Sequence, residues 1–119
     1  MKQLLFLIVF GLLSFSVKAE VVKVQGYVTD IWLFSKNYTT YDANDVGLAN
    51  IHIDSPQLQP ACGSGARRIA ISTDHPLYSS VMSMALTAKS THKKIEMWHL
   101  GKCTLRSTSW DFGLVRFLE

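Results

Sequence analysis

From residue 22 of this 119-residue chain, hydrophobic and polar residues alternate, a pattern typical of β-strands. In VKVQGYV (22–28) the three valines share one side of an extended strand, with Gly26 between two of them. The pattern then shifts at 29–30, and Ile31 and Leu33 take the inner face. A mid-strand glycine followed by such a shift is typical of a long strand that bends and changes partner.

The same alternation predicts further strands, which a polar loop over 36–47 separates from the first. The second strand is LANIHIDS, with Ile51 and Ile53 inward and His52 and Asp54 outward, and the third is RRIAIST, with Ile69 and Ile71 inward. After the helix, KKIEMWHL places Ile95 and Met97 inward, and GKCTLRSTS is the return of a hairpin with Cys103 and Leu105 inward. The apolar FGLVRFLE is the last strand. SPQLQPACGSGA, between the second and third strands, reads as an irregular connection pinned by Cys62.

DHPLYSSVMSMALTA (74–88) changes to helical spacing. Asp74 or Thr73 is expected to accept the free amides at the start of the helix, and Pro76 fits its first turn. The stripe expected to face the core comprises Leu77, Val81, Met84, Ala85 and Ala88.

The opposite face of this helix carries no charge. It comprises Ser79, Met82, Ser83, Leu86 and Thr87. A helix on the surface of a small domain normally bears charged residues on its outer face. We therefore expect this face to be buried against another polypeptide, most simply in a closed ring of identical subunits with the helices facing inward. Exposed Met and Leu side chains on a monomer are the alternative.

The order of elements predicts a mainly β fold. Three strands, one helix and two strands, with one extra terminal strand, match a small OB-fold-like barrel of five to six strands, in which the helix between the third and fourth strands closes one end. A plain α+β sandwich with the helix on one face is the alternative.

Residues 1–19 have the features of a secretory signal peptide. Lys2 precedes an apolar run over 4–15 that is too short to span a bilayer comfortably, and VKA suggests cleavage after Ala19. An uncleaved membrane anchor is the alternative. We expect a single domain over 20–119, secreted or periplasmic, with no membrane span after cleavage. Without Lys2 and Lys18, ten Lys and Arg residues face nine Asp and Glu residues, so nucleic acid is an improbable partner.

The two cysteines, Cys62 and Cys103, are expected to form a disulfide because an exported protein folds in an oxidising compartment. A catalytic cysteine with one of the four histidines is the alternative, although the sequence shows no nucleophile motif.

The segment WLFSKNYTTYDAND suggests a ligand site because aromatic and small polar side chains are interleaved in it. Aromatic rings pack against the apolar face of a sugar, and the polar groups bind its hydroxyls. The candidate glycan-binding residues are Trp32, Phe34, Asn37, Tyr38, Tyr41, Asp42 and Asn44. A hydrated loop whose rings cover the barrel is the alternative. Trp98, Trp110 and Asp111 form a second candidate, although core closure by the final strand explains Trp110 at least as well.

Other motifs predict no chemistry. DANDVG resembles a calcium loop but has Val46 and Ile53 where oxygen ligands are needed, so a turn is expected. The sequon at Asn37 matters only in a eukaryotic secretory pathway, and His52 beside Asp54 reads as a solvated pair. We therefore expect no metal, no cofactor and no enzymatic activity.

The stretch from Ile69 to Leu105 resembles the B subunits of AB5 toxins, of the subtilase cytotoxin and pertussis-like kind. The resemblance rests on a strand, TDHPLYSSVMSMALTAKSTHKKIEMW and a cysteine shortly after it, in a domain of about a hundred residues behind a signal peptide. It implies an OB-fold, a ring of usually five subunits and binding of cell-surface glycans. A separate catalytic subunit would be a further partner.

Two functions follow as expectations. The first is a non-enzymatic exported module that binds glycans in several copies at once. The alternative is a periplasmic or secreted protein–protein interaction module, such as an inhibitor or accessory factor, that uses the charge-free helix face against a different protein.

Overall fold

The computed structural model of the chain describes residues 20–118, so the predicted signal peptide lies outside the described residues. The elements in order are β1 (Val22–Ser35), β2 (Gly47–Asp54), the 3-10 turn η1 (Ala61–Gly63), β3 (Arg68–Ser72), α2 (Tyr78–Thr91), β4 (Ile95–His99) and β5 (Trp110–Phe117). The fold is therefore mainly β with one α-helix in this part of the chain, as the sequence predicts. Within residues 20–118 no helix is long and apolar enough to cross a membrane.

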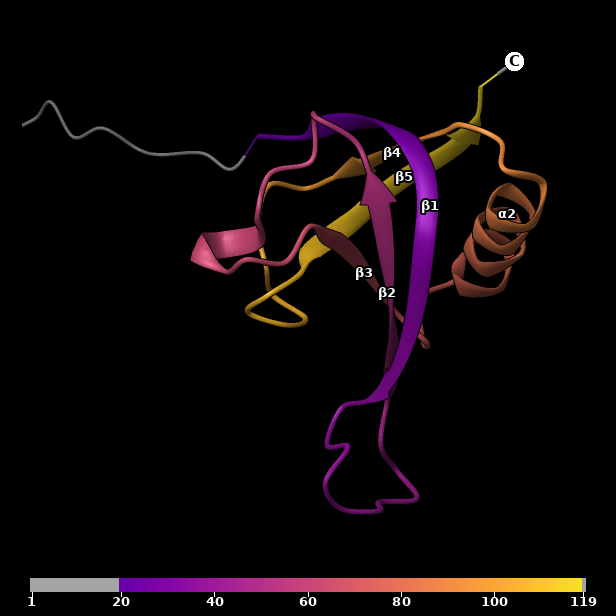
Figure 1. Cartoon of the computed structure of the whole chain (residues 1–119). Coiled ribbons are helices and arrows are strands. Elements are labelled where there is room, and N and C mark those ends of the chain that lie inside the picture. The colour runs from indigo at the N-terminus through magenta and orange to yellow at the C-terminus, as the bar shows by residue number, and fades with distance from the viewer. Residues whose placement is uncertain (1–19, 119) are drawn as a thin grey trace, which may run out of the picture.

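The five strands form one ring of pairings in the order β1-β2-β3-β5-β4, in which β4 returns to β1 (Figure 1). All neighbours are antiparallel except β3 and β5, which run parallel. That seam is the shortest, with only Ile69 opposite Trp110 and Ala70 opposite Asp111. The β1–β2 loop projects away from one end of the ring (Figure 1). Helix α2, which follows β3 in the chain, lies at the side of the ring (Figure 1).

β1 changes partner in its middle, as the alternation predicts. It pairs with β4 from Val22 to Gly26 and with β2 from Tyr27 onward, and the register shifts between Val28 and Asp30. This irregularity turns the outer face of β1 toward a different set of neighbours, and it determines which side chains reach the candidate site.

The inside of the ring holds one hydrophobic core to which every strand and α2 contribute. Its members include the predicted inward residues Ile51, Ile53, Ile69, Ile71, Ile95 and Met97, with Val81, Ala85 and Ala88 from the helix. Leu33, near the end of β1, was expected inside but is 66% exposed, although it lies opposite the buried Ala49 of β2.

The prediction of a return strand over 101–109 is wrong. This segment is a loop with one isolated bridge between Arg106 and Ser109, and Leu105 is 42% exposed. The carboxylate of Asp111 accepts the backbone N–H groups of Thr104 and Leu105, so these amides bond to a side chain instead of a neighbouring strand. The predicted disulfide between Cys62 and Cys103 is present and ties this loop to η1.

The start of α2 also differs from expectation. Leu77 is the N-cap residue and is half exposed, so it does not belong to the buried stripe. Neither Thr73 nor Asp74 caps the helix. Instead Nδ1 of His75 accepts the N–H of Leu77 at 3.0 Å, and Asp74 accepts the hydroxyl of Ser72. The imidazole lies closer in the chain to the free amide than either predicted cap does.

Candidate ligand-binding site

Three side chains of β1 point outward next to one another. After the shift between Val28 and Asp30, alternate residues place Asp30, Trp32 and Phe34 on the outside of the ring. Trp32 lies opposite Asn50, and Phe34 lies opposite Leu48. The irregularity in β1 therefore assembles an aromatic surface over the outer side of β2.

The aromatic rings of this surface contact one another. The ring centres of Trp32 and Phe34 are 6.0 Å apart with planes at 70°, and those of Phe34 and Tyr38 are 5.8 Å apart. Trp32 is 46% and Tyr38 is 62% exposed. Large exposed rings held against one another offer an apolar surface to a ligand.

Asp30 and His52 hold Trp32 in place. The indole N–H of Trp32 donates to the Asp30 carboxylate, and this hydrogen bond is the main cause that lowers the pKa of Asp30. The imidazole of His52 lies with its centre 4.9 Å from that of Trp32. The indole is thereby fixed on its polar edge and supported from β2.

Two arginines lie over these rings. Arg68 comes from β3, and its Cζ is 5.8 Å from the ring centres of both Trp32 and Phe34. Arg106 comes from the β4–β5 loop, and its Cζ lies 4.7 Å from the centre of Phe34 and 5.2 Å from that of Tyr38. We call Trp32, Phe34, Tyr38, Arg68 and Arg106 the aromatic–arginine face.

Neither arginine is paired with an acid. Arg68 is 8% exposed and donates to Ser109 Oγ at 2.9 Å and to Thr108 Oγ1 at 2.6 Å, which are neutral acceptors. Among residues 20–118 the only ion pair joins Glu96 and Arg116. The pKa of Arg68 is lowered, first by burial and then by the charge of Arg106. A buried cation is normally paired, so this arrangement favours binding of an anionic group.

The floor of the face contains polar atoms without partners. Asn50 is fully buried, and neither its amide nitrogen nor its oxygen has a hydrogen-bond partner among the described residues. The same holds for Nε2 of His52, whose pKa is lowered mainly by burial. Buried polar groups are nearly always hydrogen-bonded, so these three atoms are an unusual feature of the floor of the face.

The structure divides the predicted glycan residues into two groups. Trp32, Phe34 and Tyr38 come together in the face. The other predicted polar residues form turns in the loop: Asn37 accepts the hydroxyl of Thr39, and Asp42 accepts the N–H of Asn44. Tyr41 is 90% exposed at the loop tip, and none of the ring contacts involves it.

Sequence reasoning missed Arg68, Arg106 and Asn50, and it treated His52 as part of a surface pair. A signal was available for the strand residues. Asn50, His52 and Arg68 all occupy outward positions of their strands, and pairing those positions with Trp32 brings them into one neighbourhood. No local pattern identifies Arg106, because its loop was read as a strand.

The second predicted cluster is held in structural contacts. Trp98 donates its indole N–H to Glu96 at 2.8 Å, and Lys23 lies over its ring. Trp110 stacks on His99 at 4.4 Å, and Asp111 holds the β4–β5 loop. These contacts explain the positions of Trp98, Trp110 and Asp111 without a bound ligand.

The predicted interface residues on α2 lie mostly on its open side. Ser79, Ser83 and Thr87 are exposed, and Leu86 is 53% exposed. Met82 differs from expectation: it is half-buried and packs against the hydrophobic core, because the helix turns that flank toward the sheet. The open side is therefore narrower than the sequence indicates.

Within residues 20–118 no three His, Cys, Asp or Glu side chains are grouped closely enough to hold a metal ion. Comparison with protein families, curated proteins and solved structures finds no match to this chain.

Proposed function

We propose that this protein is an exported, non-enzymatic binding module that recognises glycans bearing an acidic group. The observation that carries the proposal is the presence of two guanidinium groups, Arg68 and Arg106, that lack an acidic partner in the described chain and lie against exposed rings. Aromatic rings pack against the apolar face of a sugar, and guanidinium groups bind carboxylate or sulfate oxygens in pairs. An acidic saccharide supplies both surfaces at once.

Export and the OB-fold belong to the same proposal. The disulfide between Cys62 and Cys103 supports an oxidising compartment such as the periplasm or the exterior. The strand order β1-β2-β3-β5-β4, with α2 between β3 and β4, supports the proposal of an OB-fold. In such folds, loops beside the β2–β3 face bind oligosaccharides and oligonucleotides.

The uncharged side of α2 supports assembly into a ring. Its exposed members are Ser79, Ser83, Leu86 and Thr87, and the helix carries no Asp, Glu, Lys or Arg before Lys89. A ring that presents several copies of the aromatic–arginine face multiplies a weak affinity for one sugar.

Glycan binding is tested by replacing Arg106 with Ala. We expect the affinity for acidic glycans to fall about 10- to 100-fold, because a charge-assisted hydrogen bond contributes about 1.5–3 kcal/mol. Trp32→Ala removes part of the apolar surface and is expected to weaken binding to a similar degree. A glycan array identifies the ligand, and calorimetric titration then measures the affinity of each variant.

Arg67→Ala is the matched control, because Arg67 is exposed, immediately precedes Arg68 and makes none of the side-chain contacts described. Its affinity should equal that of the wild type. An array without signal at high protein concentration contradicts glycan binding. Unchanged binding by Arg106→Ala places the site elsewhere on the molecule.

Assembly is tested by Leu86→Glu. We expect the native mass, measured by light scattering, to fall from that of a ring to that of one chain, because the substitution buries an unpaired carboxylate in the contact. Leu33→Glu is the control, since Leu33 is an exposed leucine that belongs to β1 and not to the helix. A wild-type monomer contradicts the ring and favours the alternative, in which the helix face binds a different protein.

A further inference from the structure

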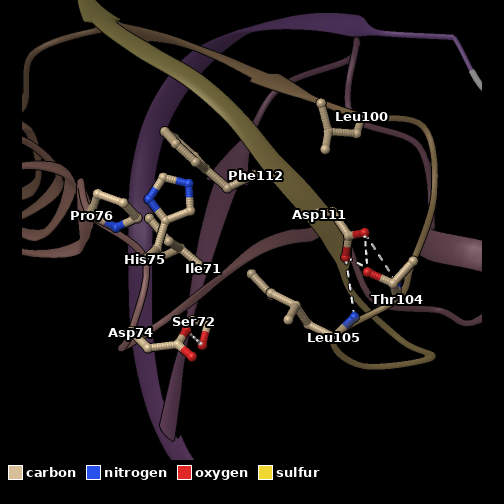
Figure 2. A pocket seen from close by; sticks show the side chains of 11 residues that line it. Ile71, Ser72, Asp74, His75, Pro76, Leu100, Thr104, Leu105, Asp111 and Phe112 are labelled. Atoms are coloured by element: carbon tan, nitrogen blue, oxygen red, sulfur yellow. Dashed lines mark hydrogen bonds between the residues drawn. The ribbon is translucent and has the colours of Figure 1, made fainter. Parts of the chain in front are cut away.

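A pocket of about 450 Å³ opens where β3 and β5 separate beyond their two-residue seam. Residues from the end of β3, the turn before α2, the β4–β5 loop and the start of β5 surround it (Figure 2). We call it the seam pocket. Its volume is in the range of pockets that hold small molecules.

The walls of the seam pocket are mainly apolar. Ile71, Pro76 and Phe112 form one side, and Leu100 and Leu105 lie across from them (Figure 2). Leu105 is 42% exposed, so part of its apolar surface is free. Phe112 adds an aromatic ring, which His75 contacts edge-on at 5.6 Å between ring centres. The pocket therefore suits a ligand with an apolar body.

The charged groups of the seam pocket are both acidic. Asp74 is exposed and lies beside Ser72 at one end of the pocket (Figure 2). Asp111 is 5% exposed, and both oxygens of its carboxylate accept hydrogen bonds, from the N–H groups of Thr104 and Leu105 and from the hydroxyl of Thr104, but it has no ion pair with a cation in the described chain. Neither Lys nor Arg lines this pocket, although Lys36 lines an adjoining pocket that shares Asp74 with it.

His75 is the remaining titratable group of the seam pocket. Its Nδ1 accepts the N–H of Leu77 at 3.0 Å, so in the neutral ring the proton is on Nε2. The negative charge of the two carboxylates is then not offset by any fixed cation of the lining. This is the opposite of the aromatic–arginine face, where two cations lack an acid.

From this charge complementarity we propose that the seam pocket is a second binding site, which takes a small organic cation with an ammonium head and an apolar body. The body lies among Leu100, Leu105 and Phe112, and the head lies toward the exposed carboxylate of Asp74. The site goes beyond the proposed glycan recognition and does not depend on it.

The test compares three probes of the same shape and different charge: benzylammonium, benzyl alcohol and benzoate. Binding is followed by the NMR shifts of the backbone amides of Leu105 and Phe112 in the mature protein. We expect saturable shifts with benzylammonium, an affinity about fivefold weaker with benzyl alcohol and no binding of benzoate. Equal affinities for benzylammonium and benzyl alcohol, or the absence of saturable shifts, overturn the proposal.

Two pairs of variants locate the site. Asp74→Asn should weaken benzylammonium about fivefold and leave benzyl alcohol unchanged, whereas Asp54→Asn, an exposed acid at the end of β2, should change neither. Leu105→Trp should fill the pocket and remove binding, whereas Phe117→Trp, at a similarly exposed position, should not. An Asp74→Asn protein that binds benzylammonium as the wild type does also overturns the proposal.

The outcome is distinguishable from that of the glycan experiment. Asp74→Asn should leave binding of acidic glycans unchanged, because Asp74 is not part of the aromatic–arginine face. Loss of glycan binding in Arg106→Ala should likewise leave the benzylammonium affinity unchanged. The proposal for either site can therefore be contradicted by its own experiment while the proposal for the other site is supported.

Discussion

Replacing Cys62 and Cys103 together with Ala is expected to lower the free energy of unfolding by about 4 kcal/mol. The disulfide joins positions 41 residues apart, and in the chain-entropy model a loop of this length contributes about that amount. This is a large part of the roughly 5–15 kcal/mol that stabilises a typical domain. Equilibrium unfolding in urea, fitted with a two-state model, measures the change.

The disulfide also has a local consequence, because it ties η1 to the β4–β5 loop near the shortest seam of the ring. That loop carries Arg106 and supplies Thr108, which accepts from Arg68. We therefore expect the double variant to bind acidic glycans more weakly even under conditions where it is folded. Wild-type protein under reducing conditions is the control and should unfold at the same urea concentration. A loss below about 1 kcal/mol contradicts the prediction.

Gly26→Ala is expected to destabilise the protein by about 3 kcal/mol. A Cβ added at Gly26 would overlap the backbone carbonyl oxygen of Asp54 and lie 2.9 Å from Cβ of Ser55. Backbone atoms cannot move aside as a flexible side chain does, so β1 or the end of β2 must shift, and such overpacking costs about 1–3 kcal/mol or more. Because Gly26 is the last β1 residue paired with β4, the shift falls where the strand changes partner.

The matched control is Gly65→Ala, because a Cβ there meets no atom within 4 Å. We expect its stability to remain within about 0.5–1 kcal/mol of the wild type, with a gain if the unfolded chain loses freedom. Urea unfolding of both variants measures the difference between them. Equal stabilities would show that the close approach at Gly26 relaxes without cost.

The alternation of side chains was sufficient to predict most of the framework. Five strands and the helix lie where the residue pattern places them, although β5 begins two residues before the predicted FGLVRFLE. The shift near Val28 was also predictable from the sequence. These features are predictable because burial repeats every two residues in a strand and every three to four in a helix. The cysteine pair was predictable for a different reason, since two cysteines allow only one intramolecular disulfide.

The failures occurred where a distant group replaced the expected local partner. Thr104 and Leu105 were read as part of a strand, but their amides bond to the carboxylate of Asp111. Asp74 was expected to cap the helix, but its carboxylate bonds to Ser72. In both places the sequence allows more than one acceptor, and the spatial arrangement selects among them.

The sequence by itself determined the fold class, the bend in β1, the disulfide and the aromatic character of the β1–β2 region. Tertiary structure alone decided which other residues meet that region. It brought Arg68 from β3 and Arg106 from a loop onto rings of β1, and it left the amide of Asn50 buried beneath them. The physical reason is that alternation defines which side of a strand a residue occupies, whereas strand register and loop path define which residues from other segments meet it there.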